Sequence, residues 1–219
     1  MVDRRPKRRQ AGRGDGARLR EDLLRAGGDI LAGSTGVADL TVRAVCDRVT
    51  VAPASFYLHF AGRDEFLYEL AYRRLGDSEA TLALTLAAVD DAFTRVELRG
   101  ESYVNFALSN PDLYRVLFMG SGHESTPTRF EEASTFADTG LGALSADVAQ
   151  AMTEGTIAAG DPDAVAAVLW MSQHGFASLL ISLPDFPWPT VAALRSTLSA
   201  FTGAALAGPE QRGPVPPTH

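Results

Sequence analysis

Cysteine and histidine are scarce in this chain of 219 residues, which holds one cysteine and four histidines. The single thiol, Cys46, excludes a disulfide framework and a cysteine metal site, so a reducing, cytoplasmic compartment is expected. The histidines, His59, His123, His174 and His219, lack the helical spacing to a second metal ligand. No Gly-x-Ser-x-Gly elbow and no glycine-rich phosphate loop is present. The sequence therefore predicts neither an enzyme nor a protein that needs a cofactor.

Long runs of β-branched residues are also missing, whereas alanine and leucine are abundant. This composition favours an all-α fold, and the length allows two small domains. Residues 164–183 form a stretch of 20 positions without charge, long enough to span a membrane. Polar Ser, Gln and His residues interrupt it, and its acidic flanks lack Lys or Arg anchors. We therefore expect no membrane contact and a helix buried on two sides.

Charge is divided unevenly along the chain. Residues 1–75 hold 14 Lys and Arg against 10 Asp and Glu, a net charge of +4, whereas residues 76–219 hold 6 against 17, a net charge of −11. Residues 1–14 form a basic arm with almost no apolar side chains and are expected to be flexible, as is the tail at 208–219. Such an arm suits DNA phosphates or a minor groove, although a merely solvated tail is the alternative.

Residues 40–60 are typical of two short helices joined by a tight turn. One apolar face of the first helix consists of Val42, Val45, Cys46 and Val49. Thr41 precedes that face, where a hydroxyl can cap free backbone N–H groups. Residues 15–33 are predicted as a supporting helix, which would complete a three-helix unit.

The second of these helices opens at Pro53, a residue suited to a first helical turn. Phe56 and Phe60, four apart, face inward. The two apolar faces can close on each other only if the helices cross steeply, which is the helix-turn-helix arrangement. Small or hydrogen-bonding groups on the outer face can approach base edges. That face carries Ala54, Ser55 and Leu58, flanked by Tyr57 and His59.

Three ordered segments resemble the DNA-binding signature of the tetracycline-repressor (TetR) family. They are Thr41-Val42-Arg43, then residues 51–60 (VAPASFYLHF), then Gly62-Arg63-Asp64-Glu65. Thr50 stands where the family has a turn glycine, although a β-branched residue resists the left-handed conformation. Ala52 replaces a capping Ser or Thr, and Arg63 keeps the positive charge of the usual Lys.

The resemblance implies residue roles on a double-stranded DNA operator. Phosphate contacts fall to Thr41, Tyr57, His59 and Arg63. Base-edge contacts fall to Arg43, Ala54, Ser55 and Leu58. Phosphate contacts set the register of the protein on the duplex, and base contacts set the preferred sequence. We also expect a homodimer on a palindrome-like site, formed through the helices near 164–183 and 190–206, because an apolar helix buried on two sides needs a partner surface.

The rest of the chain is predicted as a helical regulatory and dimerisation domain, residues 62–207, after the DNA-binding domain at 15–61. Its helices are expected at 62 to the mid-80s, 91–110, 112–119, 128–159, 164–183 and 190–206. The 128–159 helix contains glycines at 140 and 142 that can break it. Residues 102–107, residues 110–118 and the Trp170-x-x-x-His174-Gly175 pattern resemble one C-terminal type of the TetR family.

An aromatic set on these helices is predicted to line a pocket for a small, mostly apolar effector. It consists of Tyr103, Phe106, Phe118, Phe136, Trp170 and His174. The alternative is that these side chains only pack in a core, with His174 hydrogen-bonded there. The sequence thus predicts a dimeric, ligand-responsive repressor. A helical small-molecule or lipid carrier that does not act through DNA is the alternative function.

Overall fold

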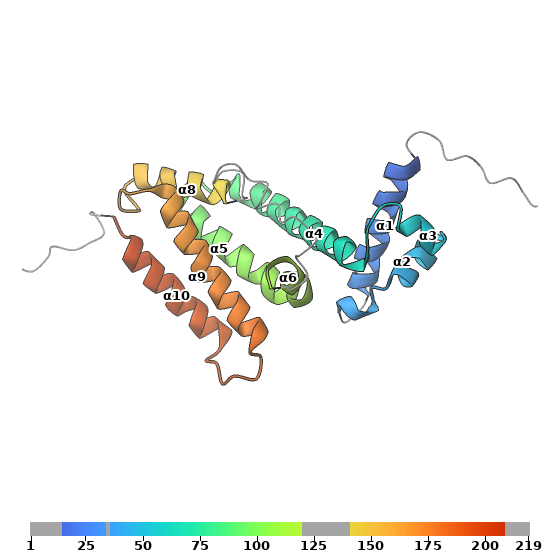
Figure 1. Ribbon diagram of the computed structural model, residues 1–219. Coiled ribbons are helices and arrows are strands. Elements are labelled where there is room, and N and C mark those ends of the chain that lie inside the picture. The colour runs from blue at the N-terminus through green and yellow to red at the C-terminus, as the bar shows by residue number, and fades with distance from the viewer. Residues whose placement is uncertain (1–14, 34–35, 120–140, 209–219) are drawn as a thin grey trace, which may run out of the picture. The chain divides into compact units, whose positions relative to one another are not determined.

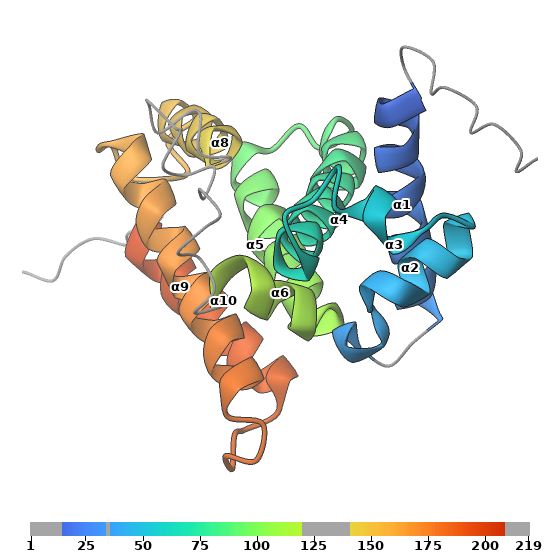
Figure 2. The same cartoon turned by 45° about the vertical axis from the view of Figure 1, so that its right-hand side comes forward.

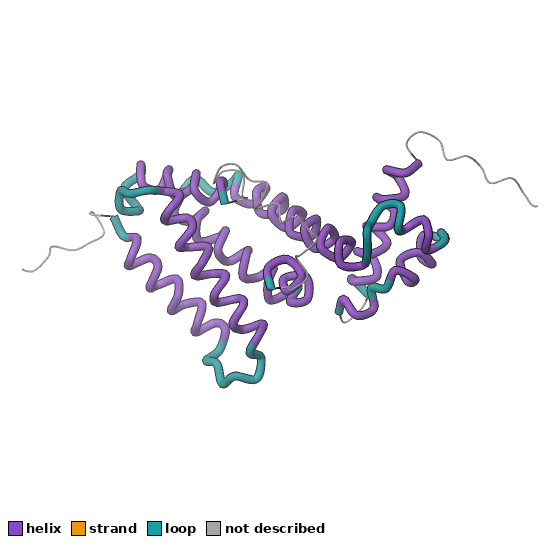
Figure 3. Tube along the Cα trace, in the orientation of Figure 1, coloured by secondary structure: helices purple, strands orange, loops and turns teal. Residues whose placement is uncertain are grey.

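The computed structural model describes residues 15–33, 36–119 and 141–208 (Figure 1). Every regular element among these residues is a helix, as Figure 3 shows, apart from one isolated bridge between Ile157 and Ala207. The all-α prediction is confirmed. The basic arm, Phe136 and most of the tail lie outside the described residues. The chain divides into two compact units, unit 1 from Met1 to Arg73 and unit 2 from Arg74 to His219.

Unit 1 contains the predicted helix-turn-helix. Its elements are α1 (Asp15–Ala32), the short 3-10 helix η1 (Val37–Asp39), α2 (Val42–Val49), α3 (Pro53–Phe56) and the first part of α4 (Arg63–Leu86). The rings of Phe56, Phe60 and Phe66 pack with centroids 5.0 to 5.3 Å apart and are almost fully buried. Glycine is required at position 27 in α1, because a Cβ there would lie 2.7 Å from the Phe66 ring. The aromatic cluster therefore fixes α1 against α3 and α4.

Local signals set the ends of α2 and α3. The Thr41 hydroxyl accepts a hydrogen bond from the Ala44 amide at 3.1 Å, which is the cap expected from the sequence. Thr50 ends α2 in the left-handed conformation, with φ 62° and ψ 46°. Ala52 begins α3 without a side-chain cap. The turn thus keeps the geometry of a glycine turn while carrying a β-branched residue, which costs free energy.

The first turns of α4 belong to unit 1 because they are tied to α1. Two ion pairs join the helices, Arg20 with Glu69 and Arg73 with Glu21, the second at 2.6 Å. Phe66, Leu67 and Leu70 are buried beside them. The division between the units accordingly falls within α4, after Arg73, whereas the sequence analysis placed it at residue 61.

Unit 2 is a bundle built on α5 (Ala92–Ser109), α8 (Gly142–Thr153) and α9 (Pro162–Ser182), with α6 (Pro111–Phe118) and α10 (Val191–Leu206) beside them. Figures 1 and 2 show α9 and α10 running side by side. A small-residue core lies where α5, α8 and α9 meet, and consists of Ala92, Val96, Val148, Ala151, Ile157 and Ala166. Small side chains at these positions let the three helices approach closely.

One predicted helix is corrected. The helix expected to continue to residue 159 ends at Thr153, because Gly155 takes φ 77° and the chain turns so that Ile157 pairs with Ala207. Its described part begins at Gly142, near the glycines that were expected to break it. The other predicted helices of unit 2 have bounds close to those observed.

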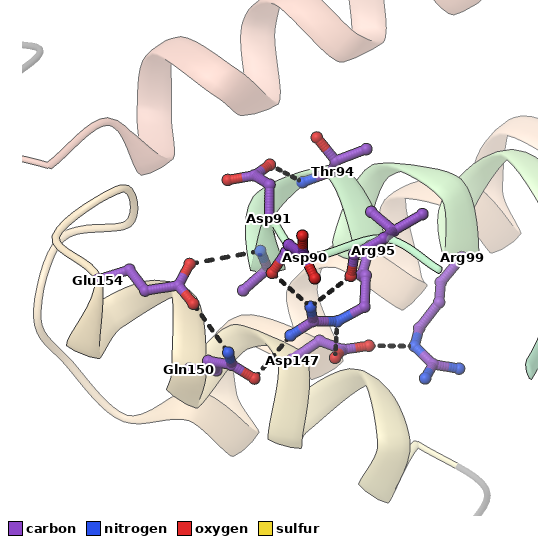
Figure 4. Close-up of polar contacts among 10 residues, drawn as sticks. Asp90, Asp91, Thr94, Arg95, Arg99, Asp147, Gln150 and Glu154 are labelled. Carbon is purple, nitrogen blue, oxygen red and sulfur yellow. Dashed lines mark hydrogen bonds and ion pairs between the residues drawn. The ribbon is translucent and has the colours of Figure 1, made fainter. Parts of the chain in front are cut away.

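A buried carboxylate joins α5 to α8. Asp147 on α8 is 8 % exposed and accepts hydrogen bonds from Arg95 Nε at 2.7 Å and Arg99 Nε at 2.6 Å, both on α5 (Figure 4). Arg95 also donates to the backbone carbonyls of Val89 and Asp90, in the turn that follows α4. One carboxylate thereby holds two guanidinium groups, and the arginines join α5, α8 and that turn.

The apolar helix α9 is long and apolar enough to cross a membrane by length and composition alone. In the structure it packs against α5 and α8, with Ala166, Ala177 and Ile181 buried. Val168 and Met171 remain largely exposed. Within one chain part of the helix surface therefore stays exposed, whereas the sequence analysis expected burial on two sides.

Replacing Thr50 with glycine should stabilise unit 1 by about 1 kcal/mol, because glycine relieves the left-handed strain but loses more backbone entropy on folding. Denaturant unfolding followed by circular dichroism measures the change. Thr50→Ala, which keeps a Cβ, is the control and should bring a smaller gain. A glycine variant no more stable than the wild type would contradict the strain.

Candidate DNA-contact surface and effector cavity

The residues predicted to contact DNA lie at the start of α2, on α3 and in the turn that follows α3. Arg43 is 88 % exposed in its side chain and forms a loose 3.7 Å ion pair with Asp47 on its own helix. Tyr57 and Leu58 are large apolar side chains that stay exposed. Thr41 and Ala54 are also exposed, and Ser55 and His59 are half-buried. Most of the predicted contact set is thus available to a partner.

Arg63 has an intramolecular role that the sequence analysis did not foresee. Its Nε donates to the Leu40 carbonyl at 2.8 Å and its Nη2 to the Val37 carbonyl at 2.5 Å. These bonds tie the start of α4 to the segment that leads into Thr41 and α2. Only Nη1 makes no hydrogen bond within the described residues, so a phosphate contact by Arg63 would use that nitrogen.

Unit 2 contains a cavity of about 530 Å³. It lies among α5, α9 and α10, and the start of α8 and Glu79 of α4 also line it. Its apolar wall includes Phe93, Val96, Leu144, Leu169, Leu198 and Leu206. A volume of this size suits a small organic ligand.

Two of the six residues predicted to bind the ligand, Tyr103 and Trp170, line this cavity. Phe106 instead lines a separate groove of about 510 Å³ between α4 and α5. Phe118 packs on the rings of Tyr114 and His174, with centroids 5.0 and 5.6 Å away. Aromatic character alone did not indicate which side of α5 or α6 would face the cavity. The last predicted residue, Phe136, lies outside the described residues.

His174 lies behind Tyr103, in a hydrogen-bonded cluster rather than on the cavity wall. Its Nδ1 is 2.7 Å from the Tyr114 hydroxyl and 3.0 Å from the Tyr103 hydroxyl, and the two hydroxyls are 3.1 Å apart. Burial lowers the pKa of His174 and raises that of both tyrosines. A neutral imidazole that accepts at Nδ1 satisfies this geometry. The cluster links α5, α6 and α9 and supports the cavity wall from behind.

The sequence analysis missed the polar residues of the cavity, among them Glu79, Arg99, Gln173 and Arg195. The Nε atom of Arg195 is buried and has no hydrogen-bond partner. Arg195 is the only charged residue between Asp185 and Glu210 in the sequence. Such an isolated cation on an otherwise apolar helix was the signal that could have identified it.

No described segment brings together three or more His, Cys, Asp or Glu side chains that could hold a metal ion. The polar groups of the cavity are instead suited to hydrogen bonds with an organic ligand. Their mixture with a large apolar wall is typical of small-molecule sites.

Two protein-family models match the chain. Residues 25–70 match the model described as bacterial regulatory proteins, tetR family, and residues 96–201 match the tetracyclin repressor-like C-terminal domain. Together the two spans cover more than half of the sequence. The chain belongs to the TetR family. Its helix-turn-helix and helical second unit are those of ligand-responsive, DNA-binding transcriptional regulators.

Solved structures share the TetR fold with this chain. A protein of unknown function from Rhodococcus sp. RHA1 is 24% identical, with a TM-score of 0.63 over 92% of this chain and 100% of that one. RolR in complex with resorcinol is 14% identical, with a TM-score of 0.64 over 90% and 91%. A putative TetR-family regulator from Rhodococcus sp. is 19% identical, with a TM-score of 0.61 over 86% and 98%. No protein with a curated description matches the chain.

The contribution of the Glu79 carboxyl group to stability should depend on pH, in a direction set by its surroundings. Desolvation at the cavity raises the pKa of its carboxyl group, against a lowering by the nearby Arg99, although the residue as a whole stays exposed. A carboxyl pKa that is higher in the folded than in the unfolded state lowers the free energy of unfolding at high pH. This loss of stability is complete above the folded-state pKa and absent well below the unfolded-state pKa.

Glu79→Gln should therefore raise the melting temperature slightly at about pH 7 and leave it unchanged at about pH 3, where the wild-type carboxyl is protonated in both states. Thermal unfolding at the two pH values measures the difference. Glu101→Gln, which removes another exposed carboxylate at the cavity, is the control. An equal gain at both pH values would indicate a packing effect and contradict the ionisation argument.

Proposed function

We propose that this TetR-family chain is a dimeric repressor that binds a palindrome-like operator and is released when a small molecule fills the cavity of unit 2. The observation that carries the proposal is the presence, in one chain, of an exposed helix-turn-helix surface and a ligand-sized cavity. RolR, which shares the fold, was solved with resorcinol, and this supports a small organic effector.

The roles of single residues follow the family signature. Thr41, Tyr57, His59 and Arg63 contact phosphates in this proposal. Arg43, Ala54, Ser55 and Leu58 face base edges. Support comes from the exposure of Arg43 and Leu58. In the major groove a long cation such as Arg43 can bind acceptor atoms of bases, and an apolar side chain such as Leu58 can contact thymine methyl groups.

Dimerisation would place two such surfaces on successive major grooves. The apolar side chains exposed on α9 and α10 support it, and they are Val168, Met171, Leu179, Val191 and Phe201. α10 has no fully buried residue in the single chain. A second copy that packs on these helices would remove this surface from water and make a two-fold interface.

The link between the cavity and DNA would be α4, whose residues belong to unit 1 up to Arg73 and to unit 2 from Arg74. An effector that prefers one position of α4 would change the operator affinity. Thermodynamic linkage then requires that the operator weaken effector binding by the same factor. Both affinities can be measured, so the proposed switch is testable without knowledge of the regulated gene.

Arg43→Ala should lower the affinity for a selected genomic fragment by about tenfold or more and relax its sequence preference, because a base-edge contact is lost. Arg48→Ala is the matched control. It removes the same charge from the same helix, but from a side chain that pairs with Asp29 of α1 at 3.7 Å, and it should change the affinity little. Mobility shifts at fixed salt compare the two, and equal losses would place Arg43 outside the base contacts.

Double substitution Val168→Glu with Met171→Glu should convert the dimer into a monomer, because two buried carboxylates without partners would be too costly at an interface. Sedimentation velocity at micromolar concentration measures the change. Leu84→Glu is the control, since Leu84 on α4 is 80 % exposed but belongs to neither α9 nor α10. A wild-type chain that sediments as a monomer would refute the dimer itself.

A further inference from the structure

One buried hydrogen-bond donor among the residues that line the cavity of unit 2 lacks an acceptor. Arg195 on α10 makes no hydrogen bond or ion pair within the described residues, and its Nε is out of reach of solvent. A buried donor without an acceptor loses its hydration with nothing to replace it, and native proteins rarely leave such groups unexplained. Arg195 is therefore arranged for an acceptor that enters the cavity.

Arg99 on α5 adds a second set of donors. Its Nε is committed to Asp147, but its two terminal nitrogens make no hydrogen bond within the described residues (Figure 4). Asp147 also forms an ion pair with Arg95, so this one carboxylate is shared by two guanidinium groups. The terminal nitrogens of Arg99 are thus free to donate to a ligand in the cavity that Arg99 lines.

Gln173 on α9 also lines the cavity and supplies a neutral amide. Its side chain lies against Gly100 of α5, where an added Cβ would be 3.0 Å from Nε2. The amide makes no hydrogen bond within the described residues. The absence of a side chain at Gly100 therefore leaves room for an amide that can donate to a ligand held between α5 and α9.

The carboxylates at the cavity do not cancel these donors. Glu97 and Glu101 are exposed, and Glu97 accepts a hydrogen bond from the Ser199 hydroxyl at 3.0 Å, so both remain hydrated at the rim. Glu79 forms no ion pair with Arg99 within the described residues, and desolvation raises the pKa of its carboxyl group. The polar atom of the cavity that is buried without a hydrogen-bond partner is therefore a donor, Nε of Arg195.

We propose that the effector is an apolar carboxylic acid whose carboxylate binds Arg195 and Arg99 and whose body lies against Phe93, Leu169 and Trp170. The inference rests on the proposed function, because it names the chemical class that the effector cavity takes. A carboxylate presents two acceptor oxygens, which match the forked donors of a guanidinium. The apolar wall then supplies binding energy by removing the hydrocarbon from water.

The test compares four probes on the purified full-length protein without DNA, by titration calorimetry below their micelle concentrations. Octanoate, octan-1-ol and octylamine share one chain and differ in the head group, whereas acetate has the head without the chain. Octanoate should bind about tenfold or more tightly than octan-1-ol, because hydrogen bonds to a charged group are stronger than neutral ones. Octylamine and acetate should bind most weakly.

Arg195→Leu should lower the octanoate affinity by about tenfold to a hundredfold and leave the octan-1-ol affinity nearly unchanged. The variant should fold normally, since Arg195 makes no hydrogen bond or ion pair within the described residues that the substitution would break, and circular dichroism verifies this. Arg74→Leu is the matched control. It removes the same charge from α4, in the separate groove between α4 and α5, and should not alter octanoate binding.

The inference is overturned if octanoate does not bind, if octan-1-ol or octylamine binds as tightly, or if Arg195→Leu leaves octanoate binding intact. These outcomes do not affect the DNA-binding assays. Conversely, octanoate could bind through Arg195 without changing the affinity for the operator. That result would support a carboxylic acid as the ligand but refute the proposed switch. The two failures are therefore distinguishable.

Discussion

Unit 2 depends on the pairing of one buried carboxylate with two guanidinium groups. Asp147 is 8 % exposed, and a carboxylate so placed is tolerated only when it is fully hydrogen-bonded. Arg95 and Arg99 meet that need, and Arg95 also binds the carbonyls of the turn after α4. Removal of Asp147 would leave two partly buried cations without an ion-pair partner. The same pairing leaves the terminal nitrogens of Arg99 beside the cavity, so the interaction that joins α5 to α8 also sets the chemistry of the ligand site.

Unit 1 depends on a different kind of constraint. The cluster of Phe56, Phe60 and Phe66 buries the inner face of the second helix of the motif, and the one-turn length of α3 forces Tyr57 and Leu58 outward. The surface available to DNA is therefore a consequence of core packing. The strained turn at Thr50 lies between α2 and α3, and such strain persists only where the surrounding packing holds it.

Features that depend on local periodicity could be predicted from the sequence, and features that depend on helix packing could not. The spacing of Phe56 and Phe60 identified the buried face, and Thr41 identified the start of α2. The cavity is different, since it forms only where α5, α9 and α10 come together. Tyr103 and Trp170 were predicted to line it, but Phe106 and Phe118 turned to other surfaces. Gln173 carried no signal, because a single amide within an apolar segment is also common in a core.

The two proposals about unit 2 meet on α10. This helix carries Arg195, whose buried nitrogen lines the cavity, and Phe201, which is 73 % exposed. It has no residue fully buried by its own chain, so its position is weakly determined within one protomer. A partner that covers Phe201 and a carboxylate that binds Arg195 would both restrict the same helix. Whichever binds first, the partner subunit or the carboxylate, would therefore lower the conformational entropy of α10 that is lost when the second one binds. If both select the same position of α10, thermodynamic linkage requires effector binding and dimerisation to favour one another.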